Sequence, residues 1–184
     1  DLRTEHDDEM IEKWITGKTG FPFLDACMKF LQTNGWINFR MRAMIMSFAS
    51  YNMWQPWQKT SPLLAKFFTD YEPGIHISQV QMQSGVTGIN LPRIYSVAKQ
   101  SMDQDPNADW IKSLIPELCD FDSESIHTAQ LGESYLPQIV NLNDSSKYAR
   151  DRIWSIRKSK AFKDEAKLVY LRHGSRRKRN FKTN

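Results

Sequence analysis

Two arginines lie two positions apart in the segment GWINFRMR, directly before the apolar run AMIMSFASYNMW. On a helix, residues at i and i+2 do not share a face, so Arg40 and Arg42 point in different directions. A guanidinium in a buried helix needs a carboxylate or a ligand to offset its loss of water. The first acidic residues after Arg42 are Asp70 and Glu72, in the segment TDYEPG. We therefore expect Arg42 to reach this segment.

A contact between Arg42 and these carboxylates has two interpretations. A charge-assisted arginine–carboxylate fork can be a structural salt bridge that joins two helices. It can also hold a fixed positive charge beside an anionic ligand. The residue types alone favour the structural salt bridge.

The composition is that of a soluble globular protein, with 184 residues, 40% of them hydrophobic and 25% charged. This length suffices for one domain with a sizeable core. No run approaches the ~20 consecutive apolar residues of a membrane span, so we expect a cytoplasmic protein. Cys27 and Cys119 have no metal-binding or redox spacing, and we expect both to be buried. The start, DLRTEHDDEM, has neither an initiating Met nor a signal sequence, which suggests part of a longer protein.

The charge is distributed unevenly along the chain. Residues 1–146 contain 11 Lys and Arg against 18 Asp and Glu, whereas residues 147–184 contain 14 against 3. The basic end can contact nucleic-acid phosphates, or it can be a solvated helix with a frayed tail. Composition alone favours the solvated helix.

The periodicity of apolar residues is helical almost throughout, which predicts an all-α fold. Pro22 and Gly35 bracket one expected helix, and Ser61 with Pro62 is expected to begin another. The final helix is expected to begin at Asp144 or Ser145. Residues 72–100 are rich in Gly, Gln and Ser, which predicts one long functional loop.

The segment WITGKTGFPFLDACMKFLQTNGWINFRMR resembles the signature W-x-x-G-x-T-G-x-P-x-x-D-A-x-M-x-x-L-x-x-x-G-W of the photolyase/cryptochrome flavoproteins. The similarity continues through SFASYNMWQPW, FTDYEPG, QSG, RIYSVAKQ and DWIKSLIPEL, and covers most of residues 14–118 in the family's order. It implies the C-terminal helical domain that folds around a U-shaped FAD and presents a cavity to DNA. Residues 1–184 would be the C-terminal part of that domain, with residues 147–184 a basic helical extension and tail.

The resemblance implies a cofactor site built from five residues. Arg42 and Asp70 match the pair beside the isoalloxazine ring, and Tyr71 and Glu72 continue the flavin-contacting turn. His76 falls where the family places a residue facing flavin N5, often Asn, Asp or Cys. A histidine there can donate to N5 or exchange a proton near neutral pH. A reduced flavin anion needs positive charge near its ring, and the Arg42–Asp70 pair meets that need without an unpaired buried charge.

The same resemblance implies contacts with DNA. Arg40 matches an arginine that reaches DNA at the lesion, and Gln100 matches a DNA-contacting glutamine. Dimer-repairing members place Asn, Met and Trp against the lesion. Phe39, Ala43 and Met82 occupy those three positions here, so much of the dimer-stacking signature is absent.

The family's photoreduction chain of tryptophans is incomplete in this sequence. Trp57 lies at the middle position, where electron transfer is implied, but Val80 replaces the flavin-proximal Trp. Electrons that reach the flavin by hopping between side chains would need another route, for example through Trp54, Tyr51 or Tyr95.

Three functions remain open from the sequence. The first is a DNA photolyase, a lyase in which photoexcited reduced FAD donates an electron to a pyrimidine photoproduct flipped out of UV-damaged DNA. The second is a cryptochrome-like blue-light photoreceptor without repair activity, which the changes at Phe39, Ala43 and Met82 favour. The third is a DNA-binding helical module with a vestigial flavin site. In the family, the segment that holds the FAD phosphates and the N-terminal antenna domain lie upstream. We therefore expect this chain to be inactive alone.

Overall fold

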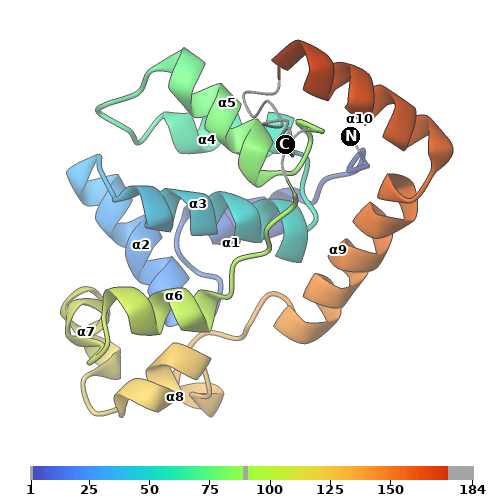
Figure 1. Ribbon diagram of the computed structural model, residues 1–184. Coiled ribbons are helices and arrows are strands. Elements are labelled where there is room, and N and C mark those ends of the chain that lie inside the picture. Colours follow the sequence, from blue (N-terminus) through green and yellow to red (C-terminus); the bar gives the residue numbers. More distant parts are fainter. Residues whose placement is uncertain (1, 89–90, 174–184) are drawn as a thin grey trace, which may run out of the picture.

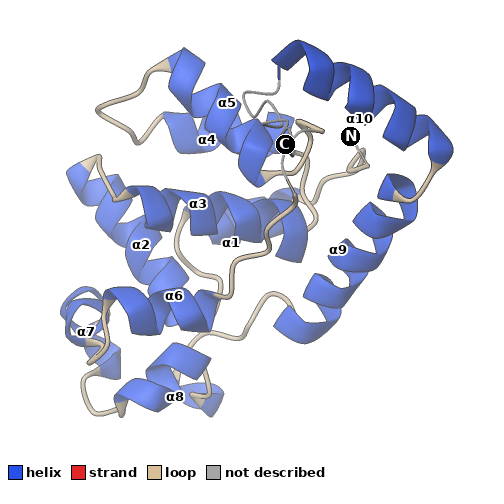
Figure 2. Cartoon of the chain, viewed as in Figure 1, coloured by secondary structure: helices blue, strands red, loops and turns tan. Residues whose placement is uncertain are grey.

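The computed structural model describes residues 2–88 and 91–173, and within these ranges every regular element is a helix (Figures 1 and 2). The predicted all-α fold class is confirmed. The α-helices are α1 (Asp8–Ile15), α2 (Pro22–Asn34), α3 (Phe39–Ser47), α4 (Trp57–Ala65), α5 (Pro73–Gln83), α6 (Val97–Gln104), α7 (Asp109–Leu114), α8 (Ser123–Thr128), α9 (Leu142–Arg157) and α10 (Lys160–His173). Short 3₁₀ turns lie at Pro116–Leu118 and Gly132–Ser134.

Helices α2 and α3 form the centre of the molecule, and local sequence explains their bounds. Pro22 is the first residue of α2, and Gly35 ends it in the left-handed conformation with φ 69°, as the sequence predicted. Asn38 is the N-cap of α3, because its side chain accepts a hydrogen bond from the Met41 amide at 3.0 Å. Figure 1 shows α3 across the middle of the molecule, with α4 and α5 on one side and α6 and α8 on the other.

The hydrophobic core surrounds α2 and α3. Most of α2 is buried, and all residues of α3 from Ala43 onward are buried. The largest fully buried side chains are those of Trp14, Tyr51, Phe21, Phe23, Phe48, Leu24, Met28, Leu31, Ile37, Met44, Ile45 and Met46. The core therefore fixes the position of α3, which carries Arg42 near its start.

A π-helical turn, Phe48–Asn52, extends α3. At its end the amide of the capping residue Met53 donates to the Phe48 carbonyl at 3.0 Å. This hydrogen bond spans five residues, where an α-helix spans four. The Asn52 side chain donates to the hydroxyls of Ser145 and Ser146, at 3.1 and 3.0 Å. The π turn therefore connects α3 to α9, which with α10 forms an arm along one side of the molecule (Figure 1).

The structure corrects the predicted long loop. Residues Pro73–Gln83 form α5, and the predicted loop is reduced to the connection between α5 and α6, where the described residues 84–88 and 91–96 are irregular. The Glu72 carboxylate accepts from the Ile75 amide at 2.7 Å, and Pro73 is the first helical residue. This N-cap and proline begin the helix although Gly, Gln and Ser make its composition look loop-like.

Three further predictions are wrong in detail. Helix α4 begins at Trp57, so Pro62 lies inside it and not at its start. Helix α9 follows an Asn141 cap, and not one at Asp144 or Ser145, because the Asn141 side chain accepts from two backbone amides of the first turn. Cys27 is buried, but Cys119 is exposed because it follows a short surface 3₁₀ turn.

No helix among residues 2–88 and 91–173 combines the length and the apolar character that a membrane crossing requires.

Candidate functional site

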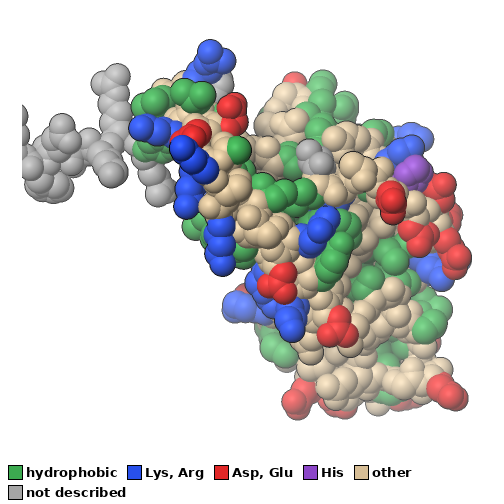
Figure 3. All heavy atoms as spheres, turned by 90° about the vertical axis from the view of Figure 1, so that its right-hand side faces the viewer, with side chains coloured by type: hydrophobic (Ala, Val, Ile, Leu, Met, Phe, Trp, Pro, Cys, Tyr) green, Lys and Arg blue, Asp and Glu red, His purple; other side chains and the backbone are tan. Residues whose placement is uncertain are grey.

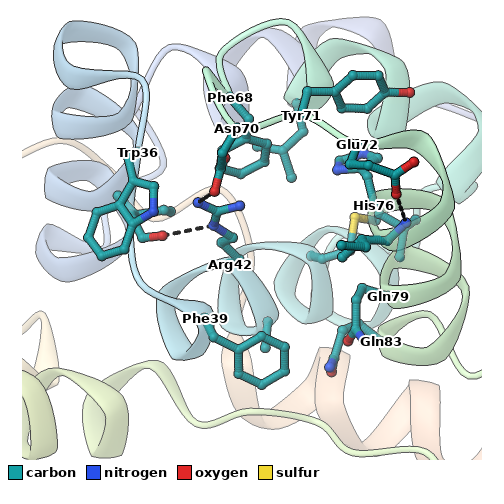
Figure 4. Close-up of a pocket in the computed structure, with 16 residues that line it drawn as sticks. Trp36, Phe39, Arg42, Phe68, Asp70, Tyr71, Glu72, His76, Gln79 and Gln83 are labelled. Atoms are coloured by element: carbon teal, nitrogen blue, oxygen red, sulfur yellow. Dashed lines mark hydrogen bonds and ion pairs between the residues drawn. The ribbon is translucent and has the colours of Figure 1, made fainter.

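A cavity of about 330 Å³ lies between α3, α4 and α5 (Figure 4). This volume is within the range of small-molecule sites, roughly 300–1,000 Å³. The residues that line it are Trp36, Ile37, Phe39, Arg42, Ala43, Met46, Leu64, Phe68, Asp70, Tyr71, Glu72, Ile75, His76, Gln79, Val80 and Gln83. Most of them are apolar, and the polar groups are concentrated around Arg42 and along α5.

Arg42 is held in the cavity wall by three groups. One terminal nitrogen, Nη2, donates to Asp70 Oδ2 at 2.8 Å, and Nε donates to the Ile37 carbonyl at 2.8 Å. The guanidinium also lies over the ring of Phe68, 4.2 Å from its centroid. The predicted Arg42–Asp70 contact is present as a single hydrogen bond and not as the expected two-bond fork, and Nε bonds instead to the backbone of Ile37.

The Arg42–Asp70 pair keeps both of its charges at neutral pH. The hydrogen bond from Arg42 lowers the pKa of the Asp70 carboxyl below its ordinary value, and the positive charge of Arg42 lowers it further. Asp70 therefore stays ionised, while about half of its side chain remains exposed. The pair places a fixed guanidinium at the edge of the cavity without burying a lone charge.

Glu72 does not share in this pair. Its carboxylate caps α5, as described above, so its immediate role is to start the helix that carries His76. Tyr71 is exposed at the cavity rim, and its ring meets the His76 ring edge-on with centroids 5.3 Å apart.

His76 is half-buried in the cavity wall and is held by α4. Its Nε2 lies 3.0 Å from the Ser61 hydroxyl and 3.2 Å from the Ser61 carbonyl oxygen. Burial lowers the pKa of His76 below 6.5; the Ser61 carbonyl opposes this shift and the charge of Arg42 adds to it. The neutral imidazole is therefore favoured, with Nε2–H able to donate to Ser61.

Gln79 is a cavity residue that sequence analysis missed. Its Oε1 is buried and accepts no hydrogen bond from the described residues, although it lies in a cavity wall. A buried acceptor without a donor is costly, so this atom fits a ligand that presents an N–H. Gln79 lies three positions after His76 on α5, so the helical period would have found it had this segment been recognised as a helix.

Several predicted residues lie together in the cavity wall and others do not. Arg42, Phe39, Ala43, Asp70, Tyr71, Glu72, His76 and Val80 line the cavity. The cavity lining does not include the others, which are Arg40, Tyr51, Trp54, Trp57, Met82, Tyr95 and Gln100. Arg40 is exposed at the start of α3, and Trp57 and Met82 are partly buried. Gln100 is buried, and its Oε1 has no hydrogen-bond partner among the residues that the structure describes. The functional roles implied for all of these residues stay predictions.

The cavity suits a planar ring with a polar edge. Apolar side chains from α3 and α5, among them Ala43 and Val80, can contact ring faces, while Arg42 and Gln79 offer one donor group and one acceptor to a polar edge. The donor set does not suit a metal ion, and no group of three or more His, Cys, Asp or Glu residues in the described part of the chain could hold one.

Comparison with known proteins identifies the family to which this chain belongs. The family described as the FAD binding domain of DNA photolyase matches residues 1–155. A deoxyribodipyrimidine photo-lyase from Alkalihalophilus pseudofirmus is 31% identical over 129 residues, which cover 69% of this chain and 27% of that protein. A cryptochrome DASH from Oryza sativa is 30% identical over 150 residues, 79% of this chain and 25% of that protein.

A solved structure agrees with the sequence matches. The crystal structure of an archaeal photolyase from Sulfolobus tokodaii, described with two FAD molecules, superposes with a TM-score of 0.78 at 27% identity. The superposition covers 84% of this chain and 37% of that one. This chain thus spans about a quarter of the length of the curated relatives named above. The chain belongs to the family of FAD-binding domains of DNA photolyase.

Proposed function

We propose that this chain forms the isoalloxazine side of the FAD site in a longer, light-driven flavoprotein that repairs a pyrimidine photoproduct in UV-damaged DNA. The observation that carries the proposal is the Arg42–Asp70 pair in an apolar cavity, which also holds the unpaired acceptor of Gln79. The short coverage of the relatives supports placing the rest of the FAD site, and an N-terminal antenna domain, elsewhere in the parent protein.

The residues of the cavity have separate tasks in this function. Arg42 holds a positive charge that stabilises an anionic ring, and Asp70 keeps that charge in place. Apolar side chains exclude water from the ring faces, which strengthens these electrostatic contacts. His76, which burial keeps neutral and which Ser61 holds in position, occupies the α5 side of the cavity. FAD, when bound there, supplies absorption of light and transfer of a single electron to the photoproduct.

The DNA would approach from the start of α3. Arg40 is exposed and lies on a different face of α3 from Arg42, which suits a contact with a phosphate rather than with the flavin. Phe39 lines the cavity and is 56% exposed, so its ring can contact a flipped base at the mouth.

A second function, blue-light reception without repair, has its own support. Phe39 and Ala43 stand in the cavity wall at positions where the resemblance implies Asn and Met in dimer-repairing members. A cryptochrome DASH is also among the relatives with 30% identity. In this function the same flavin photochemistry alters the binding of a partner.

One pair of measurements separates these functions. The full-length protein that carries this chain is purified, its flavin absorption is recorded, and its reduced form is illuminated with UV-irradiated DNA. Repair predicts a flavin band and a light-dependent loss of pyrimidine photoproducts, with no loss in the dark. A flavin band without this loss selects the photoreceptor, and no flavin band contradicts both and leaves a DNA-binding module.

A further inference from the structure

Helices α9 and α10 carry a concentrated positive charge that the flavin site does not use. Residues 147–173 contain nine Lys and Arg against three Asp and Glu. Figure 3 looks onto the side of the molecule where these helices lie, and Lys and Arg side chains gather there in a band. Eight of the nine basic side chains are exposed, and the ninth, Arg157, is partly buried at the corner between the helices.

The apolar faces of both helices are turned toward the body of the molecule. Ile153 and Ile156 of α9, with Phe162 and Val169 of α10, line a second cavity of about 440 Å³ against Trp54 and the segment after α5. Arg157 lies over the rings of Trp154 and Phe162, at 5.7 and 5.0 Å, which holds the corner. The orientation of each helix about its own axis is therefore set by its apolar side.

The outer faces repeat one pattern. On α9 and its C-cap, Lys147, Arg150, Trp154 and Lys158 lie at positions i, i+3, i+7 and i+11, and all four are exposed. On α10, Lys160, Lys163, Lys167 and Leu171 have the same spacing and are also exposed. This spacing places each set on one face of its helix. Two successive helices thus present basic faces turned away from the body.

The charges on these faces are not neutralised by neighbours. Asp151 and Asp164 lie four residues after Lys147 and Lys160, a spacing that permits an ion pair on a helix. Within the described part of the chain, however, none of the six outer Lys and Arg side chains forms an ion pair; those found lie elsewhere, for example Lys13–Glu9 and Lys99–Asp103. Basic side chains also outnumber the acids on these helices, so a net positive charge remains available to a polyanion.

We propose that the outer faces of α9 and α10 bind the phosphate backbone of DNA, at a surface separate from the flavin cavity and without preference for damage. The cavity is lined by residues 36–83, and none of its lining residues belongs to α9 or α10. Residues 1–146 have more acids than bases, so the long-range attraction for a polyanion comes from residues 147–184, of which this arm is the described part. The surface holds undamaged duplex near the protein, and it does so without the flavin.

The salt dependence of DNA binding tests this surface. In the full-length protein, Lys160, Lys163 and Lys167 are changed together to Gln, which keeps the helix and removes the charge. The matched control changes Lys18, Lys59 and Lys66 to Gln; these are also exposed and make no ion pair within the described residues. Affinity for an undamaged duplex is measured in the dark over a series of salt concentrations, after circular dichroism confirms folding.

The expected result is specific to the arm. Each lost phosphate contact reduces the slope of log affinity against log salt by about 0.9, so the α10 variant should lose about 2 to 3 from the slope and the control none. An unchanged slope in the α10 variant, or an equal loss in both, overturns the proposal. Binding to vesicles that contain anionic lipid is measured for the same variants. If the α10 variant loses binding to vesicles but keeps its binding to DNA, the proposal is overturned in favour of a membrane surface. Because the duplex is undamaged and no light is used, the salt dependence can be interpreted even if the protein proves not to bind flavin or not to repair DNA.

Discussion

Arg42 contacts three separate parts of the chain: the carbonyl before α3, the Phe68 ring after α4, and the Asp70 carboxylate. A lysine at this position could replace the charge but not the two directed hydrogen bonds. The arginine therefore both positions a charge and joins the segment after α4 to the start of α3.

The first prediction concerns flavin retention. Arg42→Ala removes a charge-assisted contact, worth about 1.5–3 kcal/mol, from the cavity edge, so FAD affinity of the full-length protein should fall about tenfold or more. Fluorescence titration with FAD measures this. Lys99→Ala is the control, because it removes a surface ion pair with Asp103 on α6. Equal FAD affinity in Arg42→Ala and the wild type would refute the role given to Arg42.

The second prediction concerns pH. The pKa of His76 is lowered in the folded protein, mainly by burial, so below pH 6.5 the unfolded chain takes up a proton more readily than the folded one. Stability should therefore fall as the pH drops through 6.5 toward the lower folded pKa.

His76→Gln, which keeps a hydrogen-bonding side chain but does not titrate, should lose this part of the pH dependence. Urea unfolding at a series of pH values measures it for both proteins. Parallel curves for the variant and the wild type would show that His76 does not contribute.

Residue chemistry alone predicted that Arg42 contacts an acid of the segment TDYEPG but did not decide between Asp70 and Glu72, whereas the family resemblance implied Asp70. A buried arginine needs a carboxylate, and Asp70 and Glu72 are the first two downstream of it. The choice depends on Glu72, which is used as the N-cap of α5. Because α5 itself was predicted to be a loop, nothing in the residue chemistry excluded Glu72, and only the family resemblance favoured Asp70.

At the scale of the elements, α5 shows how packing overrides composition. Gly, Gln and Ser give it no apolar stripe, yet it packs against α3 and α4 and supplies one wall of the cavity. The local signal was the pair Glu72–Pro73, an N-cap followed by a proline at the first helical position. Helix α2 was predictable from Pro22 and Gly35 by the same rule, because its core-facing residues also follow the helical period.

The third prediction tests the cap of α5. Glu72→Ala should leave the Ile75 amide with only its longer bond, 3.2 Å, to the backbone carbonyl of residue 72, and should destabilise the start of α5 by about 1 kcal/mol. Hydrogen exchange of the first amides of α5 measures this locally. Glu72→Asp, which is a good N-cap residue, is the matched control and should keep most of the protection. Equal loss of protection in both variants would contradict the capping role.

At the scale of the whole molecule, Asp25 joins distant parts of the chain. This buried carboxylate accepts from the Thr19 amide and hydroxyl, the Gly20 amide and the Tyr135 hydroxyl, at 2.6 to 3.1 Å. Burial raises its pKa, and the hydrogen bonds from Thr19, Tyr135 and Gly20 oppose that shift. The network attaches α2 to the segment between α8 and α9.

The fourth prediction compares two ways of breaking this network. Asp25→Ala leaves several buried donors unpaired and should lower the free energy of unfolding by about 3 kcal/mol or more. Tyr135→Phe removes a single hydrogen bond and should cost about 1 kcal/mol. Urea unfolding of both variants gives the comparison, and equal losses would show that Asp25 does not organise the other donors.

The uneven distribution of charge along the chain was predicted from the sequence, but the arrangement of the two basic helices was not. The contrast between residues 1–146 and 147–184 is visible in the sequence. The division of the basic end into two helices with outward Lys and Arg depends on the corner at Arg157 and on contacts of α9 with the π turn. Those contacts join residues about ninety positions apart, which a local period cannot predict.

The π turn Phe48–Asn52 amounts to one surplus residue in an otherwise regular helix. Deleting one residue there would restore the ordinary helical repeat and turn everything after it by about 100°. Asn52 would then face away from Ser145 and Ser146, and α9 would lose its anchor on α3. A change in length of a single residue in this turn would thus redirect the basic arm relative to the flavin cavity.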